Sequence, residues 1–282
     1  MRALIVGYGR AGRRHAKILK SLISDIQIVV VDPFAVEDDA SYMDIQSAFS
    51  LKCDFAVICT PPDQHLADIR ACLNADIKYI MCEKPVCGLE QLKEAEKMQD
   101  VPVMIAYNYR YHSALELALK KEKQRGKTWQ FYSDQQRVEW PSWGFLIDHL
   151  GHTFDILTAL DEPACIESAI QLTHRADDGY KIGEALWVQG KTANGTKVEI
   201  ADCVRKHFVQ RAAWINGPFG YMDMSQPGKM FENMWISFLH SMVTRKRFAI
   251  TIEDALPAQR MIEDTARVLV RKDTQWGTAN SF

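Results

Sequence analysis

The chain has 282 residues with 47% hydrophobic side chains, so it can bury a large core and divide into two domains. Its formal charge of −2 provides no strongly basic surface, so we expect no nucleic-acid partner. No run of 18 apolar residues occurs, so we expect no membrane span. The chain enters a strand at once, so we expect no signal peptide. Seven cysteines, an odd number without a C-x-x-C pair, are typical of buried reduced thiols, so we expect a cytoplasmic protein.

The chain opens with a strand, a glycine-rich turn and a helix. Residues 2–6 are an apolar run of strand length, Gly7, Gly9 and Gly12 follow, and helical apolar spacing continues over 13–23. The first glycine permits a tight turn, the second lets the backbone approach a pyrophosphate, and the third allows close helix packing, with the phosphates at the helix N-terminus. This order predicts a dinucleotide site.

A second strand, over 26–31, ends at Asp32, which lies 20 residues beyond Gly12. A carboxylate at this place can accept hydrogen bonds from ribose hydroxyls and would repel a 2′-phosphate, so we predict NAD rather than NADP. One alternative is a glycine-rich turn followed by a surface acid. Another is a methyltransferase, which can open in the same way but would not need the lysine and histidine described below.

Strands and helices continue to alternate over the first hundred residues, which is typical of a parallel sheet covered on both faces. We expect helices at 41–49, from Pro62 onward and over 89–95, and strands at 55–59, 77–82 and 101–106. The fold class is therefore α/β, with a doubly wound Rossmann domain over 1–107.

Glu83-Lys84-Pro85 follows the predicted strand at 77–82. The carboxyl ends of strands in an open parallel sheet form the edge where ligands bind, so Lys84 is a candidate site residue. The alternative is a solvated surface lysine.

The pattern changes after residue 107. We expect helices at 113–125 and 145–160, strands near 166–173, 184–191 and 197–205, and a hairpin turn at Asn194-Gly195. Residues 108–282 then form a substrate-binding and oligomerisation domain of α+β type, with a mostly antiparallel open sheet. Its uncovered face could pair with a second subunit, so we expect a homodimer or homotetramer.

The helix at 145–160 has two distinct faces. At 100° per residue, four apolar residues cluster within about 80°, and Asp148, His152 and Asp155 cluster within about 60° on the opposite face. The four are Leu146, Leu150, Phe154 and Leu157. A solvated helix face would give the same pattern. The i, i+4 spacing of Asp148 and His152 nevertheless lets the acid orient the imidazole.

Several motifs in this order resemble those of the Gfo/Idh/MocA family, which includes glucose–fructose oxidoreductase and inositol dehydrogenase. They are Gly7-Tyr8-Gly9-Arg10-Ala11-Gly12-Arg13-Arg14-His15, Ile58-Cys59-Thr60-Pro61-Pro62, Glu83-Lys84-Pro85, Asn108-Tyr109-Arg110-Tyr111-His112, Asp148-x-x-x-His152-x-x-Asp155, Asp161-Glu162-Pro163 and Ile252-Glu253-Asp254-Ala255. The resemblance implies a Rossmann domain, a second domain with a large open sheet, and oxidation or reduction of sugars, nucleotide sugars or cyclitols with NAD(P). Ser113 and Ser142-Trp143-Gly144 depart from the family pattern beside the expected substrate pocket, so the substrate stays open.

The resemblance also assigns residues. The catalytic set is Lys84, Asp148 and His152. We expect these three residues to act together with two further sets. The expected cofactor-binding set is Gly7, Gly9, Arg10, Ala11, Gly12, Asp32, Thr60, Pro61, His65, Glu83 and Lys84, and the expected substrate-binding set is Lys84, Asn108, Arg110, Trp143, Asp148 and His152. Other roles remain open: His15 and His65 can cap or pack within the nucleotide domain, Arg110 can brace the domain junction, and Trp140 and Trp143 can be buried. We expect no metal, because the histidines form no metal set and hydride transfer needs none.

Oxidation of a secondary alcohol needs a base near the hydroxyl and a cation near the oxygen. We assign His152 as the base, Asp148 as the group that fixes its tautomer, and Lys84 as the cation. Two other functions remain open: a reductase of a non-sugar unsaturated acceptor, such as an imine or a conjugated tetrapyrrole, and a non-catalytic NAD-sensing regulatory protein.

Overall fold

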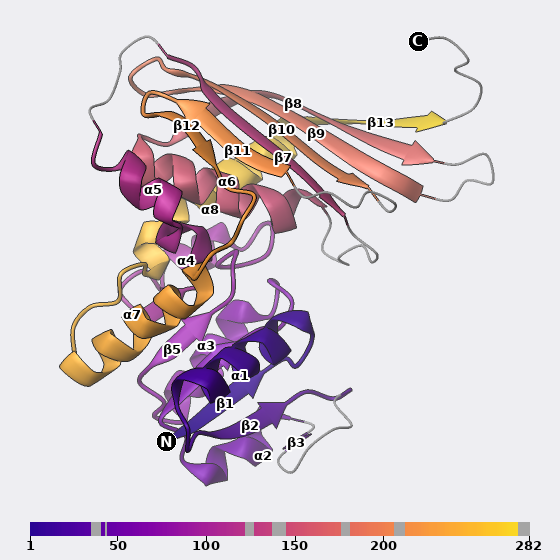
Figure 1. The fold of residues 1–282 in the computed structure, drawn as a ribbon. Helices are drawn as coiled ribbons and strands as arrows, with labels where there is room; N and C mark the ends of the chain where they lie inside the picture. The colour runs from indigo at the N-terminus through magenta and orange to yellow at the C-terminus, as the bar shows by residue number, and fades with distance from the viewer. Residues whose placement is uncertain are drawn as a thin grey trace. The chain divides into compact units, whose positions relative to one another are not determined.

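The computed structural model describes residues 1–34, 41–42, 44–121, 127–136, 145–175, 181–205 and 212–275. The chain divides into two compact units, residues 1–108 with 229–259 and residues 109–228 with 260–282 (Figure 1). The first crossing lies one residue beyond the predicted boundary at 107. The return of 229–259 to the first unit differs from the predicted division, in which all residues after 107 formed the second domain.

The first unit contains a six-stranded parallel sheet in the order β3-β2-β1-β4-β5-β6. Its strands are β1 Arg2–Val6, β2 Gln27–Val31, β3 Ser41–Tyr42, β4 Phe55–Ile58, β5 Ile80–Cys82 and β6 Val103–Ile105. This is the Rossmann strand order, so the predicted doubly wound sheet is confirmed. The order reverses between β1 and β4, and in such sheets ligands bind at this point, beyond the carboxyl ends of the strands.

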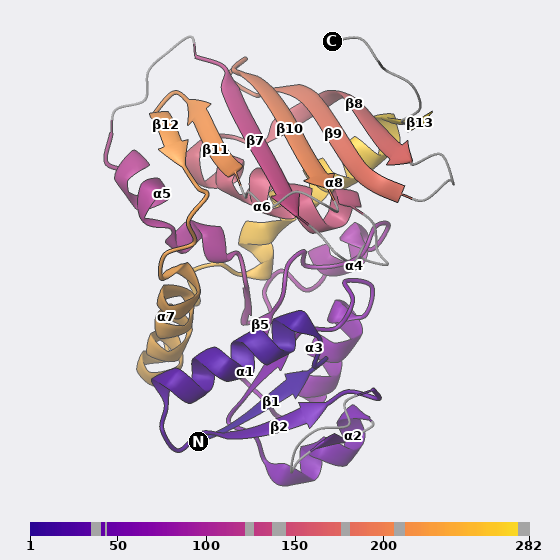
Figure 2. The same ribbon diagram turned by 45° about the vertical axis from the view of Figure 1, so that its right-hand side comes forward.

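Helices and short turns connect these strands. They are α1 Arg10–Leu22, α2 Ile45–Ala48, the 3-10 turn η1 Phe49–Leu51, α3 His65–Asn74 and α4 Leu92–Glu96 (Figure 2). The unit also contains α7 Met230–Thr244 and the first part of α8 Ile252–Val268, which come later in the chain. The helix predicted at 41–49 is wrong at its start, because Ser41 and Tyr42 pair with Val30 and Val31 as an edge strand. The helix predicted from Pro62 begins only at His65, since a turn closed by the Gln64 N–H and the Pro61 carbonyl precedes it.

Aromatic packing explains why α7 belongs to the first unit. The Trp235 ring lies 5.9 Å from that of Phe55 in β4, and the Phe238 ring lies 5.6 Å from Phe55. All three side chains are fully buried. Truncating such a ring to alanine typically costs about 3–5 kcal/mol, so this cluster holds the later segment on the parallel sheet of the first unit.

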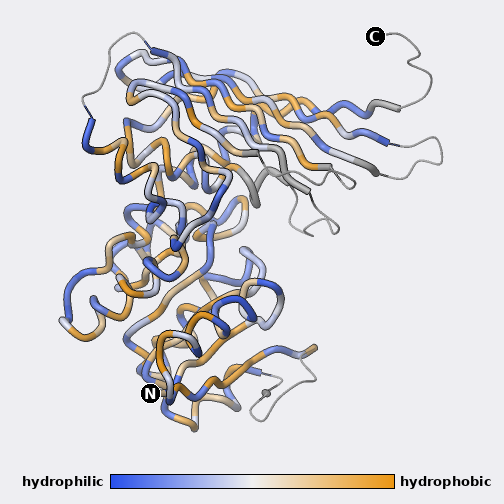
Figure 3. The backbone as a smooth tube through the Cα atoms, viewed as in Figure 1, coloured by the Kyte–Doolittle hydropathy of each residue, from blue (hydrophilic) through white to orange (hydrophobic). Residues whose placement is uncertain are grey.

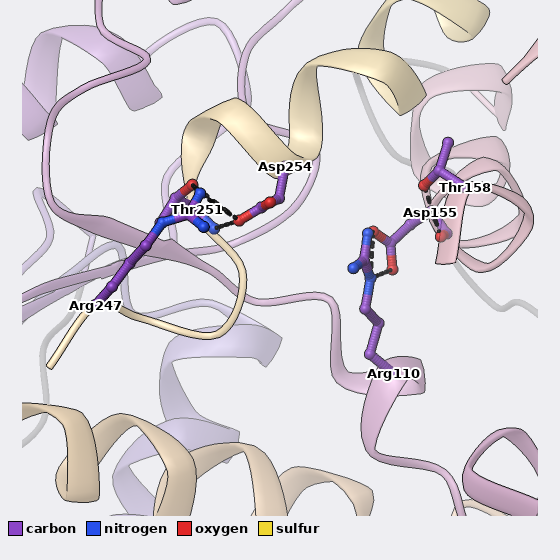
Figure 4. Close-up of polar contacts among 6 residues, drawn as sticks. All are labelled: Arg110, Asp155, Thr158, Arg247, Thr251 and Asp254. Atoms are coloured by element: carbon purple, nitrogen blue, oxygen red, sulfur yellow. Dashed lines mark hydrogen bonds and ion pairs between the residues drawn. The ribbon is translucent and has the colours of Figure 1, made fainter. Parts of the chain in front are cut away.

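The start of α8 is capped by polar contacts in the same unit. The Asp254 carboxylate accepts hydrogen bonds from the Thr251 N–H at 2.8 Å and from the Thr251 hydroxyl at 2.9 Å. Arg247 donates to the same carboxylate (Figure 4). A negative charge in the first helical turn also interacts favourably with the positive end of the helix dipole.

The second unit contains a seven-stranded sheet in the order β12-β11-β7-β10-β9-β8-β13. Its strands are β7 Trp129–Gln136, β8 Ala164–Arg175, β9 Lys181–Thr192, β10 Lys197–Arg205, β11 Ala212–Gly217, β12 Gly220–Asp223 and β13 Leu269–Gln275. Four neighbouring pairs are antiparallel and two, β7 with β10 and β8 with β13, are parallel. The prediction of a mostly antiparallel sheet is confirmed, and the predicted hairpin at Asn194-Gly195 is present, with Gly195 at a φ of +83°.

The sheet of the second unit is covered on one face. Its helical elements include η2 Asn108–Tyr111, which begins at the unit boundary, α5 Ser113–Ala118 and α6 Phe145–Leu160. Figures 1 and 2 show α6 and α8 against one face of this sheet, and hydropathy alternates along the strands (Figure 3). Leu186 is fully buried, for example, and the next residue, Trp187, is 42% exposed. Helix α5 ends earlier than predicted, at Ala118.

The seven cysteines are all free. Burial raises the pKa of Cys72 to about 12, so its thiolate form is scarce at neutral pH. The expectation of buried thiols holds for Cys72, Cys82 and Cys87. It is wrong for Cys165, which is exposed at the start of β8, and for Cys53, Cys59 and Cys203, which are partly exposed. Among the described residues, no helix combines the length and apolar character needed to cross a membrane, and no group of three or more His, Cys, Asp or Glu side chains gathers as a metal set would.

Candidate active site

The glycine-rich turn joins β1 to α1 beside the point where the strand order reverses. Gly7 has a φ of +88°, and a Cβ at this position would lie 2.7 Å from the carbonyl carbon of Cys59. A Cβ on Gly12 would collide with the carbonyl oxygen of Gly7. These two glycines therefore allow β1, β4 and α1 to pack closely.

Gly9 has open space beside it, where a side chain would begin. Its φ of −71° and ψ of −154° suit any residue, and an added Cβ would meet no described atom within 4 Å. Gly9 is the N-cap of α1, so it has no side chain to cap the helix, and the first turn of α1 contains no acidic residue. The space beside Gly9 and the uncapped N–H groups fit an anionic group such as a pyrophosphate.

Asp32 follows β2, and backbone groups hold its carboxylate. One oxygen accepts a hydrogen bond from the Tyr8 N–H at 2.6 Å, and the other accepts from the Phe34 N–H at 2.8 Å. The first of these bonds ties the acid to the glycine-rich turn. Each carboxylate oxygen can accept a further hydrogen bond, which a ribose hydroxyl could donate.

Thr60 and His65 organise the turn after β4. The Thr60 hydroxyl donates to the Asp68 carboxylate at 2.6 Å. The buried His65 ring has one nitrogen 2.8 Å from the Thr60 carbonyl oxygen and the other 2.8 Å from the Pro85 carbonyl oxygen. His65 thus links the turn that contains Thr60 and Pro61 to the loop after β5.

Glu83 is the first residue of the loop after β5 and is 8% exposed. Its carboxylate lies 3.0 Å from His15 Nε2 and 3.2 Å from Arg14 Nη2, and it accepts from the Lys84 N–H at 3.2 Å. Burial alone would raise the pKa of Glu83. The hydrogen bond from His15 and the positive charges of Arg14 and Lys84 outweigh burial and hold this pKa well below its usual range.

Lys84 follows directly, and its side chain is half-buried. Partial burial disfavours the alternative of a freely solvated surface lysine. The Lys84–Pro85 peptide bond is cis. Strand β5 ends at Cys82, so Lys84 lies just beyond its carboxyl end. Lys84 belongs to the same unit as the glycine-rich turn and Asp32.

In the second unit, α6 begins and ends at the predicted residues, Phe145 and Leu160. His152 is half-buried, and its ring meets the Tyr109 ring edge-on with centroids 4.8 Å apart. Asp148 belongs to the same helix, one turn earlier, and its side chain lies outside the described part of the structure. The predicted i, i+4 placement of Asp148 and His152 on one helix is therefore present.

Arg110 binds Asp155 on the polar face of α6. Arg110 Nε lies 2.9 and 3.0 Å from the two Asp155 oxygens, and Nη2 lies 2.7 Å from one of them (Figure 4). The side chain of Asp155 is only 1% exposed, so the polar face of α6 is not simply a solvated surface. Arg110 therefore braces η2 against α6 within the second unit.

The two remaining substrate candidates are less informative. Asn108 is buried at the unit boundary, and its N–H donates to the Ala106 carbonyl. Trp143 and its neighbour Trp140 lie outside the described residues.

The sequence analysis missed three buried polar residues on the helix-covered face of the second sheet. Glu184 and Asp202 are 6% and 2% exposed, and Gln171 donates to Glu184 at 3.0 Å. Strand pairing places Gln171 and Asp202 on the same face as the buried Leu186. The available signal was a polar residue at a position where strand alternation predicts a buried apolar one.

The predicted residues therefore gather in two groups. The glycine-rich turn, Asp32, Thr60, Pro61, His65, Glu83 and Lys84 belong to the first unit, and Arg110, Asp148 and His152 belong to the second.

Residues 1–107 match the family model of Gfo/Idh/MocA, described as an oxidoreductase family with an NAD-binding Rossmann fold. This match agrees with the resemblance that the motifs within residues 1–107 indicated. No curated protein matches the chain.

Solved structures show a similar fold over both units. A scyllo-inositol dehydrogenase from Lactobacillus casei aligns with a TM-score of 0.76 and 17% identity, covering 95% of this chain and 96% of that one. A myo-inositol 2-dehydrogenase from Lactobacillus plantarum aligns with a TM-score of 0.75 and 17% identity over the same shares. A UDP-N-acetylglucosamine 3-dehydrogenase from Acidithiobacillus ferrooxidans aligns with a TM-score of 0.70 and 15% identity, covering 95% and 97%. At these identities the likeness establishes the fold.

Proposed function

We propose, from the match of residues 1–107 to the NAD-binding domain of the Gfo/Idh/MocA oxidoreductases, that this protein is an NAD-dependent dehydrogenase or reductase. It transfers a hydride between nicotinamide and a carbinol or carbonyl carbon of a sugar, nucleotide sugar or cyclitol. The observation that carries the proposal is the glycine-rich turn with open space at Gly9, in the same unit as Asp32 and Lys84.

The residues around the turn fit a dinucleotide. The N-terminus of α1 and the space at Gly9 would receive the pyrophosphate, and Asp32 would accept hydrogen bonds from the adenosine ribose. The fixed carboxylate of Asp32 would repel a 2′-phosphate, which supports NAD over NADP. When bound, NAD supplies a hydride acceptor at C4 of its nicotinamide ring.

The catalytic roles follow from the chemistry of a secondary alcohol. As the carbon loses hydride, its hydroxyl proton passes to the His152 imidazole, and Lys84 stabilises the negative charge that develops on the oxygen. Asp148, one turn before His152 on α6, would orient the imidazole and stabilise its protonated form.

A hydroxyl-rich substrate suits the second unit. Buried Glu184, Asp202 and Gln171 lie on the sheet face that α6 covers, and carboxylate and amide groups recognise hydroxyls by hydrogen bonds. The inositol and UDP-N-acetylglucosamine dehydrogenases that share the fold support the same substrate class.

The direct test is a substrate panel. Purified protein is incubated with NAD or NADP and with cyclitols, sugars or nucleotide sugars, while the absorbance of the reduced cofactor is followed. We expect turnover with at least one polyol and a preference for NAD. Tight NADH binding without turnover of any compound would favour a non-catalytic NAD sensor, and turnover of an imine or a conjugated tetrapyrrole alone would favour a different reductase.

We also propose that the open face of the second sheet pairs with a second copy of the chain, in a homodimer or homotetramer. Strand pairing aligns one row across this face, which carries exposed apolar side chains. The row is Val270, Ile170, Trp187, Ala201, Tyr132 and Trp214. Trp187 is 42% exposed and Val270 is 50% exposed, and apolar rows of this kind are typical of subunit interfaces. The seven free cysteines are compatible with the proposed cytoplasmic location.

A further inference from the structure

A buried chain of hydrogen bonds ends at the backbone of Lys84. The Trp235 indole N–H donates to His15 Nδ1 at 3.0 Å, His15 Nε2 lies 3.0 Å from the Glu83 carboxylate, and Glu83 accepts from the Lys84 N–H at 3.2 Å. Trp235 and His15 are fully buried, and all four residues belong to the first unit. These hydrogen bonds thus connect α7 through α1 to the loop after β5.

The donor at one end determines the protonation of His15. An indole N–H can only donate, so His15 Nδ1 must accept and carries no proton. The proton of the neutral imidazole then lies on Nε2, from which it is donated to Glu83. Without the indole, neither tautomer of His15 would be selected at Nδ1.

Packing fixes the orientation of these groups. The His15 and Trp235 rings meet at 76° with centroids 5.5 Å apart, and Phe238 lies 5.4 Å from the Trp235 ring. One turn before Trp235 on α7, Phe231 lies 4.2 Å from the Arg14 guanidinium, and Arg14 also binds Glu83. Helix α7 therefore contacts both residues of α1, Arg14 and His15, that hold the Glu83 carboxylate.

We propose that Trp235 and His15 are positioning residues for Lys84: the indole selects the Nε2–H tautomer of His15, and His15 orients Glu83 so that its carboxylate holds the Lys84 backbone. The catalytic consequence depends on the proposed dehydrogenase function, whereas the positioning itself does not. Neither residue contacts substrate in this account.

Two measurements test the positioning without any substrate. Nitrogen-15 NMR of histidine-labelled protein should show His15 with a protonated Nε2 and an unprotonated Nδ1. Hydrogen exchange at the Lys84 amide should be slow in the wild type and about 10- to 100-fold faster in His15→Met, which removes the donor at similar volume. His15→Gln can place an amide N–H near the position of Nε2, and should restore much of the protection.

Turnover separates positioning from general support of the fold. Trp235→Phe keeps an aromatic ring without the N–H and should lower kcat about 2- to 10-fold with an unchanged Kd for NADH, because one neutral hydrogen bond is lost. His15→Met should lower kcat further, about 10- to 100-fold, and His15→Gln should recover activity. Phe238→Leu is the matched control, since it disturbs the same aromatic cluster but none of these hydrogen bonds.

The proposal is overturned if the His15 proton lies on Nδ1, if Lys84 amide exchange is equal in wild type and His15→Met, or if Phe238→Leu slows turnover as much as His15→Met. If the wild type turns over no substrate, the dehydrogenase function fails, and the NMR and exchange measurements still decide the positioning.

Discussion

Lys84 and His152 carry the proposed chemistry, and neither belongs to the glycine-rich turn. We expect Lys84→Ala and His152→Ala each to lower kcat by about 10²- to 10⁴-fold. Lys84→Ala removes the cation that stabilises the developing alkoxide, and His152→Ala removes the base that accepts the hydroxyl proton. NADH affinity, measured by fluorescence titration, should change little. The exposed Lys93 and His240 provide matched alanine controls that should keep full activity. Unchanged turnover in either site variant would contradict its assignment.

Glu83 should make folding stability depend on pH at the acid end. Its pKa is lowered in the folded protein, where burial is outweighed by His15, Arg14 and Lys84. The carboxylate therefore stabilises the fold above its unfolded pKa of about 4.3, and this stabilisation is lost as the pH falls towards the folded pKa. Urea unfolding should show wild type more stable than Glu83→Gln at pH 7, with a difference that shrinks below about pH 4. A difference that stays constant down to pH 3.5 would contradict this account.

At the scale of single residues, local sequence was informative where the role is local. Gly7 and Gly12 make close backbone contacts, and Asp32 lies beside the glycine-rich turn, as their spacing predicted. The link from His15 to Glu83 was not predictable in this way. The partner that selects the His15 tautomer, Trp235, lies 220 residues further along the chain.

At the scale of elements, alanine substitutions at Gly9 and Gly12 test cofactor binding and helix packing separately. Gly12→Ala would push a Cβ into the Gly7 carbonyl oxygen and should destabilise the fold by about 1–3 kcal/mol. Gly9→Ala meets open space and suits the observed backbone angles, so stability should stay within about 0.5 kcal/mol. The new methyl would occupy the proposed pyrophosphate site, and the Kd for NADH should rise roughly 5- to 100-fold.

Thermal unfolding and NADH titration of the two variants check this pair. Gly9→Ala binding NADH as tightly as wild type would show that the space beside Gly9 does not receive the cofactor.

The elements themselves were predicted well where one periodicity dominates. Helix α6 and strand β10 have the predicted bounds, because apolar residues recur at helical spacing in one and alternate in the other. Ser41–Tyr42 was placed in a helix, but it is a two-residue edge strand. Such a short strand forms through its pairing with β2, and two residues carry no detectable period.

At the scale of the whole molecule, the open sheet face predicts self-association. Val270→Glu would place a charge in the apolar row and should yield a species near the 32.2 kDa of one chain, whereas wild type should run as a dimer or tetramer. Light scattering after size-exclusion chromatography measures this mass. Val243→Glu, the same substitution at an exposed site on α7, should leave the oligomer intact. Equal masses for wild type and Val270→Glu would count against this interface.

The order of local signals along the sequence was sufficient to predict the fold class and the glycine-rich turn of this protein. A strand, a glycine-rich turn, a helix and then an acid can be recognised from sequence because each depends on backbone sterics and on periodicity over a few residues. These signals were sufficient to predict the parallel Rossmann sheet.

Only the tertiary structure decided which distant segments pack together. Residues 229–259 return to the first unit because Trp235 and Phe238 bury their rings against Phe55, and Arg110 is bound by Asp155 because η2 meets α6. Burial and ion pairing act between surfaces that folding brings together, and no local period encodes which surface meets which.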